Sequence, residues 1–492
     1  MQLKPYKVNI KTGGVNVAVI HENTAHRMDL HVNDRVLLTS DRSKAICVLD
    51  ITKNGFPKHK IGLFSEAYDE LNIDPGDTVE LTVADKPKSV LHIREKLDGK
   101  RLSPAQLNDI VYDVVNGNLS DVEMTYFVSG CYAYGLNDDE TAALTKAIVH
   151  NGKKLEFKGK IVADKHCIGG VPGNRVTPIV VSIVTAAGIL MPKTSSRAIT
   201  SPAGTADAVE VVCNVTINAH KLMTIAKKVG GFMVWGGGVD LAAADDRMIK
   251  IRNPMSLDPE GMLLASIMAK KHSVSANHVI IDIPVGPGVK IPDAARAQHL
   301  KRRFLKIGKM LGMKVQVMIT DGSQPIGNGI GPLLEMIDVM NILKNEKEAP
   351  ADLREKSIME AGLLLELCGK AKKGQGSKLA THLLDSGKAW RKFNQIINAQ
   401  GKKKIPKLAK YSQKIAAPVA GKVKAITNKP IAHLARLAGA PKDVTGGLYL
   451  HKKVGDTVKK GEALYTVYSG NPERLKYTVD FIKSNGTGYQ IK

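Results

Sequence analysis

The first 86 residues alternate apolar and polar positions in short runs, a pattern that predicts β-strands. The run from Leu30 to Leu38 is echoed by the run from Leu71 to Leu81, and each copy contains a turn that carries Asn or Asp. Two copies of one turn-and-strand unit predict a small β-barrel. We expect this N-terminal domain to span residues 1–86.

Amphipathic helical patterns follow within residues 87–158. The pair Ser103-Pro104 supplies an N-cap and a first helical residue, and apolar side chains then recur at i, i+3, i+4 spacing. Ser120 and Glu123 form a capping box that opens a second helix. The stretch 138–151 predicts a third helix that an Asp pair opens. We expect a small helical domain, which later helices can complete.

Between residues 159 and 348, strand-like apolar runs alternate with Gly-rich turns and helical stretches. The strand-like runs are Lys160–Ala163, Pro178–Ala186, Val209–Val215, Val279–Val285 and Val315–Thr320. Strands that alternate with helices predict a parallel α/β sheet. The ligand of such a sheet binds beyond the carboxyl ends of the strands, in the turns that follow them.

The remaining chain predicts helices and a basic linker over residues 349–412, then a β-rich domain over residues 413–492. This last domain is similar to the hammerhead of biotinyl and lipoyl carriers, and the barrel repeat is similar to that of double-psi β-barrels. The expected fold class is therefore multidomain α/β. Its parts are an N-terminal double-psi-like β-barrel, a small helical domain, a central parallel α/β domain and a C-terminal α+β hammerhead-like domain.

Apolar runs and cysteines narrow the class of protein. No apolar run reaches the ~20 residues that cross a bilayer, and the N-terminus lacks the apolar core of a signal peptide. We therefore expect a cytoplasmic protein with no membrane partner. The five cysteines lie far apart, with no cluster at zinc-ligand spacing. We expect reduced thiols, no metal and no cofactor.

The formal net charge of +24 is concentrated between Lys370 and Lys429. This stretch contains sixteen Lys or Arg residues and one acid, Asp385. A surface that stacks nucleic-acid bases would interleave more aromatic residues than this stretch contains. We expect a solvated basic face with no specific nucleic-acid partner. A basic protein also attracts phosphorylated metabolites.

Two turn segments suit an anion. DKHCIGGVPGNR, residues 164–175, places Lys165 and two glycines after a strand-like run, and it matches neither the P-loop nor the dinucleotide pattern. SSRAITSPAGTADAVE, residues 195–210, gathers hydroxyls and backbone amides around Arg197. Each segment by itself is also consistent with an ordinary turn, but together they favour a phosphate site.

These two segments resemble the thymidine/pyrimidine-nucleoside phosphorylase family, whose second motif is close to SGR-[GA]-L-[GA]-x-x-GGTxDxxE. The chain departs from that motif at Ser196, Ile199, Thr200 and Ala203. These departures and the additional N-terminal domain are similar to the archaeal AMP phosphorylase branch. The resemblance implies that AMP and inorganic phosphate, a co-substrate, give adenine and ribose 1,5-bisphosphate, with CMP and UMP as further candidate substrates.

An alternative within the family is a phosphorylase that acts on unphosphorylated thymidine or uridine. In nucleoside phosphorylases an Arg helps to bind the pyrimidine. When Ser266 is aligned with the family's Ser, Arg252 is offset from that Arg by one residue, which favours a substrate with a different base. An alternative of another class is a basic polyanion-binding protein that has lost the chemistry. The resemblance to this family implies a dimer built through the helical domain. We therefore expect a homodimer or a higher homo-oligomer, to which residues 1–86 contribute.

The resemblance also implies roles for individual residues. Asp258 is the expected proton donor to the leaving base, although Asp258-Pro259-Glu260 also fits a helix N-cap. The expected phosphate ligands are Lys165, Ser195 and Thr205, and His166 and Lys270 are expected to face the base or the sugar. The expected AMP contacts are Gly170, Ser196, Arg197, Ala198, Ile199, Thr200, Ser201, Thr205, Ser266 and Lys290.

Overall fold

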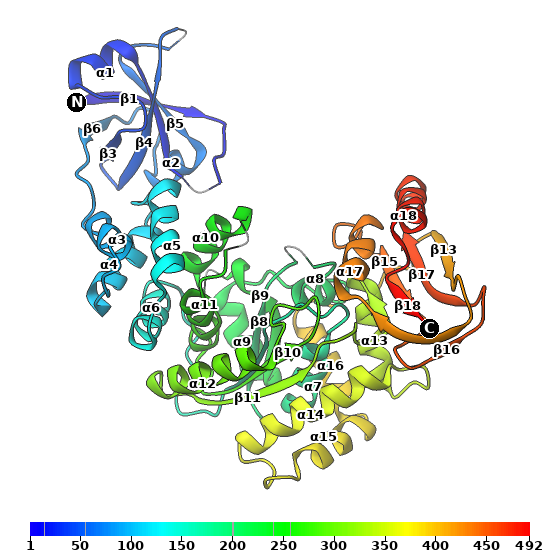
Figure 1. Cartoon of the computed structure of the whole chain (residues 1–492). Coiled ribbons are helices and arrows are strands. Elements are labelled where there is room, and N and C mark those ends of the chain that lie inside the picture. The colour runs from blue at the N-terminus through cyan, green and yellow to red at the C-terminus, as the bar shows by residue number, and fades with distance from the viewer. Residues whose placement is uncertain (14, 55, 199–200, 240, 256) are drawn as a thin grey trace. The chain divides into compact units, whose positions relative to one another are not determined.

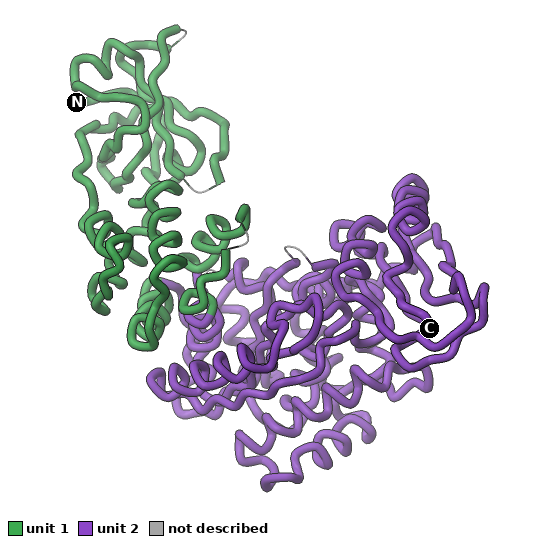
Figure 2. The backbone as a smooth tube through the Cα atoms, in the orientation of Figure 1, with its two compact units in different colours: residues 1–151, 243–263 green, residues 152–242, 264–492 purple. Residues whose placement is uncertain are grey.

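A computed structural model describes residues 1–13, 15–54, 56–198, 201–239, 241–255 and 257–492. The chain forms two compact units (Figure 2). Unit 1 holds residues 1–151 and 243–263, and unit 2 holds residues 152–242 and 264–492. Within the described ranges, no helix combines the length and apolar character that a membrane crossing requires.

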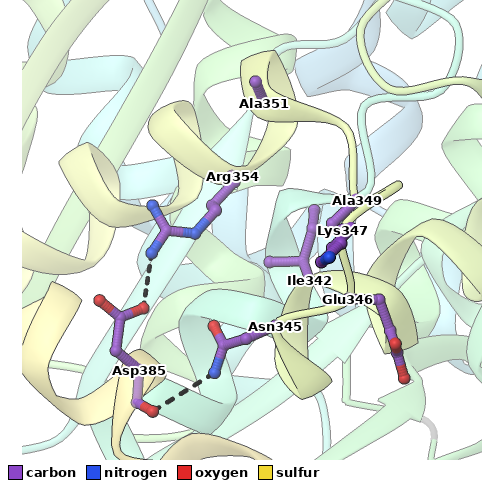
Figure 3. A pocket seen from close by; sticks show the side chains of 8 residues that line it. All are labelled: Ile342, Asn345, Glu346, Lys347, Ala349, Ala351, Arg354 and Asp385. Carbon is purple, nitrogen blue, oxygen red and sulfur yellow. Dashed lines mark hydrogen bonds and ion pairs between the residues drawn. The ribbon is translucent and has the colours of Figure 1, made fainter.

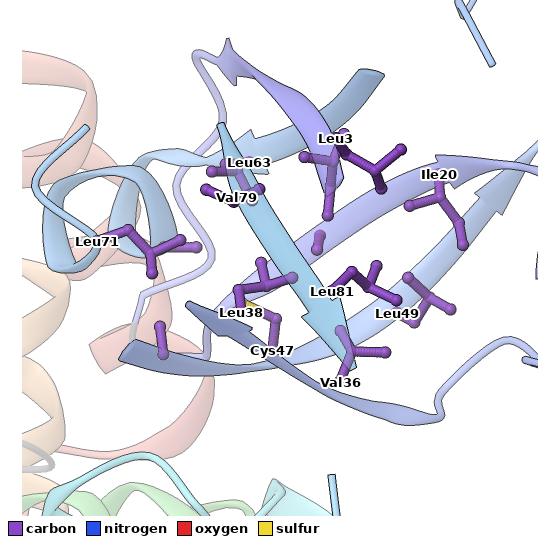
Figure 4. Packing of buried hydrophobic residues seen from close by; sticks show 14 of the residues in the cluster. Leu3, Ile20, Val36, Leu38, Cys47, Leu49, Leu63, Leu71, Val79 and Leu81 are labelled. Carbon is purple, nitrogen blue, oxygen red and sulfur yellow. The ribbon is translucent and has the colours of Figure 1, made fainter. Parts of the chain in front are cut away.

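Unit 1 begins with a closed six-stranded barrel in the order β1-β5-β2-β4-β3-β6 (Figure 1). Its elements are β1 (Gln2–Val8), β2 (Val17–His21), α1 (Glu22–Met28), β3 (Arg35–Thr39), β4 (Lys44–Thr52), β5 (Lys60–Phe64), α2 (Ser65–Glu70) and β6 (Val79–Val83). The two predicted repeats end in β3 and β6, which pair antiparallel with Leu38 opposite Leu81. Both leucines are fully buried in the barrel core (Figure 4). The predicted barrel is confirmed.

The helical part of unit 1 contains α3 (Ser89–Leu97), α4 (Pro104–Val115), α5 (Asp121–Tyr134), α6 (Asp138–His150) and α10 (Ala243–Arg252). Ser103 caps α4 and Ser120 caps α5, as predicted. Both caps are reciprocal capping boxes, of which only the one at Ser120 was predicted. Helix α10 comes from much later in the chain and packs on α4 and α5. Helix α3 was not predicted, because its few apolar side chains form only a weak stripe.

Unit 2 is built on parallel strands. One sheet has the order β11-β10-β7, formed by β11 (Lys314–Asp321), β10 (His278–Val285) and β7 (Ala163–Cys167). A second pairs β8 (Met191–Ser195) with β9 (Gly231–Trp235) in parallel. A parallel bridge between Val162 and Leu190 places β8 beside β7. The expected parallel α/β domain is confirmed, and the predictions of β10 and β11 were correct.

Three other strand predictions were wrong. Pro178–Ala186 lies within helix α7 (Val176–Ala186), which is buried on all sides except near its end. A fully buried helix has no polar face, so its β-branched run resembles a buried strand. Val209–Val215 begins in α8 (Thr205–Glu210) and continues as turns. A strand was predicted at Lys160–Ala163, but strand β7 begins only at Ala163.

Helices cover these sheets and lead into a C-terminal β domain (Figure 1). The helices are α7, α8, α9 (Ala219–Val229), α11 (Glu260–His272, which begins in unit 1), α12 (Ala294–Met310), α13 (Pro332–Lys344), α14 (Ala351–Leu367), α15 (Gly376–Asp385) and α16 (Lys388–Ala399). The C-terminal elements are β13 (Tyr411–Ala416), β14 (Gly421–Ile426), α17 (Asn428–Leu437), β15 (Gly447–Leu450), β16 (Thr457–Val458), β17 (Ala463–Ser469), α18 (Pro472–Asn485) and β18 (Tyr489–Ile491). The short strand β12 (Gly329–Ile330) joins their sheet by pairing with β15.

Candidate active site

Strand β7 presents a buried carboxylate that gathers two lysines. Asp164 is fully buried, and its carboxylate lies 3.2 Å from Lys193 Nζ and 2.7 Å from Lys271 Nζ. Lys193 also donates a hydrogen bond to the backbone oxygen of Lys165 at 2.9 Å. These contacts fix the end of β7 against β8 and against α11. Sequence reasoning did not identify either lysine as part of this cluster, since both lie far from Asp164 in the chain.

Lys165 is part of a second buried cluster. Its Nζ lies 2.8 Å from Glu360 on α14, and both side chains are almost fully buried. Nearby, Lys356 lies 2.8 Å from Asp282 on β10, which also accepts a hydrogen bond from Thr320. Burial raises the pKa of the Glu360 carboxyl. The structure thus holds the ammonium of the expected phosphate ligand against an internal acid.

His166 lies among positive charges. The pKa of His166 lies well below its usual value, first because the side chain is buried and then because of nearby positive charges. These charges are those of Lys271, Lys193, Lys270 and Lys165. The imidazole is therefore neutral at pH 7 and can donate or accept a single hydrogen bond on each ring nitrogen. The charge of Lys270 is one cause of this lower pKa, so the two residues expected at the base or sugar are linked electrostatically.

Ser195 and Thr205 stand at the ends of adjacent structural elements. Ser195 is the last residue of β8, and its buried hydroxyl has no hydrogen-bond partner within the described ranges. Thr205 begins α8, and its hydroxyl accepts a hydrogen bond from Arg175 at 2.7 Å. Arg175 also donates to the Ala203 oxygen at 3.0 Å and to Glu335 at 2.6 Å. A buried hydroxyl without a partner and a second hydroxyl held by a fixed guanidinium each suit an anion ligand.

The loop that joins β8 to α8 is folded tightly on itself. Asp207 accepts hydrogen bonds from the backbone of Ala198 at 2.7 Å and of Gly204 at 2.9 Å. A Cβ on Gly204 would lie 2.6 Å from the backbone of residues 196–198, so only glycine fits there. Arg197 is paired with Asp207 at 3.1 Å and with Glu210, and its guanidinium lies 5.0 Å from the Trp235 ring centroid.

The structure therefore uses Arg197 to hold this loop, and the neighbouring acids offset its charge. Ser196 and Ala198 belong to the same tight turn, and Ser201 donates a hydrogen bond to the Ala203 oxygen at 3.2 Å. The predicted contacts Ile199 and Thr200 lie outside the described residues.

Gly170 and Lys290, two of the expected nucleotide contacts, are brought together. Gly170 has φ +101°, and a Cβ there would lie 2.8 Å from the backbone nitrogen of Lys290 and 2.8 Å from Cα of Val289. The Gly-rich turn after β7 thus packs directly on the loop after β10. Because both turns leave the carboxyl edge of one parallel sheet, they occupy the place where α/β sheets bind ligands.

Asp258 belongs to unit 1 and Ser266 to unit 2. The Asp258 carboxylate is about half exposed and lies 3.8 Å from the guanidinium of Arg252, which is buried. Helix α11 begins at Glu260, one residue later than an N-cap at Asp258 would imply. Ser266 is buried on that helix.

A separate hollow of about 420 Å³ lies between the end of α13, the start of α14 and the end of α15 (Figure 3). Arg354 and Asp385 form an ion pair of 2.6 Å on its wall, and Asn345 donates to the backbone oxygen of Asp385. None of the expected site residues lines this hollow. The candidate site therefore stays at the sheet edge.

Models of protein families match three stretches of the chain. Residues 91–152 match the glycosyl transferase family helical bundle domain, and residues 159–390 match the a/b domain of the same family. Residues 422–487 match the pyrimidine nucleoside phosphorylase C-terminal domain. These matches confirm the expected succession of a helical, an α/β and a C-terminal domain.

Curated relatives cover nearly the whole chain. An AMP phosphorylase of Methanococcus maripaludis is 42% identical over 474 residues, which is 96% of this chain and 94% of the relative. A Legionella pneumophila protein, provisionally named a thymidine phosphorylase, is 40% identical over 479 residues, which is 97% of this chain and 93% of the relative.

Among solved structures, anthranilate phosphoribosyltransferase from Thermus thermophilus is similar with a TM-score of 0.54 and 16% identity. The match covers 63% of this chain and 98% of that structure. At this identity the likeness shows a shared fold. The identities over almost the full length show more: the chain belongs to the thymidine/pyrimidine-nucleoside phosphorylase family of pentosyl-transferring enzymes, which includes the AMP phosphorylases.

Proposed function

We propose that the chain catalyses the phosphorolysis of AMP. An oxygen of inorganic phosphate forms a bond to C1′ of the ribose while the bond from C1′ to N9 of adenine breaks. The products are adenine and ribose 1,5-bisphosphate. CMP and UMP are further candidate substrates, because the same ribose 5′-phosphate is present in each.

The contact of Gly170 with the Lys290 loop is the structural observation that supports a nucleotide as substrate. It places a lysine beside the Gly-rich turn at the ligand edge of the sheet. A 5′-phosphate calls for such a cation, whereas a neutral nucleoside does not. Relatives named AMP phosphorylase, 41–42% identical over nearly the full length, support the same substrate.

The attacking phosphate is assigned to Ser195, Thr205 and Lys165. The free Ser195 hydroxyl and the Thr205 hydroxyl beside Arg175 offer hydrogen bonds to phosphate oxygens. Phosphate competes with Glu360 for the ammonium of Lys165, because that ion pair is 2.8 Å long in this structure. Orientation of the nucleophile supplies much of the rate enhancement in such a displacement.

The leaving adenine takes a proton at N7, and we assign its donation to Asp258. His166 and Lys270 are assigned to the base or sugar, and neutral His166 can hydrogen-bond either one. Ser266 and the loop from Ser196 to Ser201 are assigned to the nucleotide. No cofactor is required for this displacement, since phosphate and a proton donor complete it.

The alternative is a phosphorylase for unphosphorylated thymidine or uridine, which the provisional name of the Legionella relative favours. Base release measured by chromatography from AMP, CMP, UMP, adenosine, thymidine and uridine, each with and without phosphate, separates the two. Phosphate-dependent adenine from AMP with inert adenosine supports the proposal. Turnover of thymidine or uridine alone refutes it.

Asp258→Asn tests the proton donor in the same assay. The loss of a general acid is expected to lower kcat by about 10²- to 10⁴-fold, with little change in KM for AMP.

We also propose that the chain forms a homo-oligomer through residues 1–86 and the helical domain, and that it is cytoplasmic. We further propose the domain boundaries given above, a double-psi fold for the N-terminal barrel and a hammerhead fold for the C-terminal domain.

A further inference from the structure

The loops that follow β10 and β11 touch each other at the candidate site. A Cβ on Gly286 would lie 2.8 Å from the carbonyl carbon of Gly322. A Cβ on Gly322 would lie 3.2 Å from Cγ1 of Val289. A side chain on Gly286 would therefore clash with the β11 loop, and one on Gly322 would press against Val289. The position of Lys290, which follows Val289, therefore depends on the β11 loop as well as on its own.

The first residue of α17, in the C-terminal domain, joins both loops. Asn428 donates from Nδ2 to the oxygen of Gly322 at 2.8 Å and to the oxygen of Pro287 at 3.4 Å. The side chain is 1% exposed, and within the described ranges its Oδ1 has no hydrogen-bond partner. A buried oxygen without a partner costs about 1–3 kcal/mol. Stability by itself therefore does not explain an asparagine at this place.

The next residue, Lys429, lies on the loop that carries Lys290. Gly288 has φ +80°, and a Cβ there would lie 3.5 Å from Cγ of Lys429 and 3.7 Å from its backbone nitrogen. Lys429 is exposed, and no acid pairs with it in the described part of the chain. By contrast, Arg175 and Arg197 are both paired with acids.

We propose that the start of α17 is part of the nucleotide site. Asn428 is a positioning residue that holds the Lys290 loop, and Lys429 is a second cation that favours substrates with a 5′-phosphate over nucleosides. This inference rests on the proposed AMP phosphorolysis and extends it to residues of the C-terminal domain.

Lys429→Met tests the cation, with Lys424→Met as the matched control. Lys424 is an exposed lysine on β14 of the same domain, so both variants remove one charge. We expect Lys429→Met to raise KM for AMP about three- to tenfold, the effect of one charge contact open to solvent. The KM for inorganic phosphate should stay within about twofold. Equal KM values for AMP in the two variants, or a matching rise in KM for phosphate, would overturn the assignment.

Asn428→Ala and Asn428→Asp test the positioning role, with thermal unfolding measured beside the kinetics. We expect Asn428→Ala to raise KM for AMP about tenfold at constant KM for phosphate. Asn428→Asp should raise it further, because a carboxylate would face two carbonyl oxygens. Lower stability with an unchanged KM for AMP would show a purely structural role.

Failure of this inference differs from failure of the proposed function. A wild-type enzyme that releases no adenine from AMP refutes both. A wild-type enzyme that releases adenine, with Lys429→Met and Asn428→Ala kinetically unchanged, refutes the inference and leaves the proposed function standing.

Discussion

Gly169 and Gly170 form a matched pair for testing the placement of Lys290. Their φ angles are +98° and +101°, a region that costs other residues on the order of 1–3 kcal/mol. A Cβ on Gly169 meets nothing within 4 Å, whereas a Cβ on Gly170 lies 2.8 Å from the Lys290 nitrogen. A comparison of Gly169→Ala with Gly170→Ala therefore cancels the backbone strain and leaves the contact with the Lys290 loop.

The expected size of the effect follows from that distance. Ordinary contact between carbon and its neighbours begins at about 3.5 Å, so the Lys290 loop must retreat by roughly half an ångström or more in Gly170→Ala. Because a misplacement of 1 Å can cost about 100-fold in rate, we expect Gly170→Ala to lose about tenfold in kcat/KM for AMP beyond Gly169→Ala.

The assay is steady-state phosphorolysis of AMP together with urea unfolding of both variants. Gly169→Ala should show the strain as lost stability, of order 1–3 kcal/mol, and little loss in KM. Equal losses of activity in the two variants would refute the reasoning, since the contact would then have no part in substrate binding.

Three further predictions concern buried charges. Lys165→Met leaves Glu360 buried and unpaired, so it should lower the free energy of unfolding by about 3–5 kcal/mol. In urea unfolding, the double variant Lys165→Met/Glu360→Leu should recover most of this stability, while phosphorolysis stays absent. Burial raises the pKa of Asp338 to about 6, so its contribution to stability is greatest below pH 3.8 and is lost as pH rises through 6. The wild type should therefore lose about 3 kcal/mol relative to Asp338→Asn between a pH well below 3.8 and a pH well above 6, and parallel pH profiles of unfolding would contradict this. Arg175→Lys cannot reproduce the three-way contact with Glu335, Ala203 and Thr205, and we expect a rise of about tenfold in KM for phosphate, whereas an unchanged KM would exclude Arg175 from the phosphate site.

Local signals in the sequence were sufficient for much of the fold. The N-cap at Ser103, the capping box at Ser120 and the repeat around Leu38 and Leu81 depend on neighbouring residues, and the structure has them as predicted. Helix α7 was mistaken for a strand because its surroundings bury every face of the helix. Its apolar run therefore shows no helical periodicity.

The site was predictable only where a motif is continuous in the chain. Gly170, Ser195 and Thr205 stand in two short segments, and the resemblance found them. The acids that hold the site's cations, Glu335 and Glu360, come from helices far along the chain. No spacing rule links them to Arg175 or Lys165, although acids within helical runs that are rich in apolar residues were a signal that could have prompted the search.

The pairing of β12 with β15 has a consequence for how the protein melts and how it can be divided. Ile330 of β12 contributes to the hydrophobic core of the C-terminal domain, although it precedes that domain by about eighty residues. A chain cut before Tyr411 would expose this side chain and an unpaired strand edge, which favours aggregation. In calorimetry, unit 2 should therefore unfold as a single cooperative block, and its two halves should not survive as separate modules.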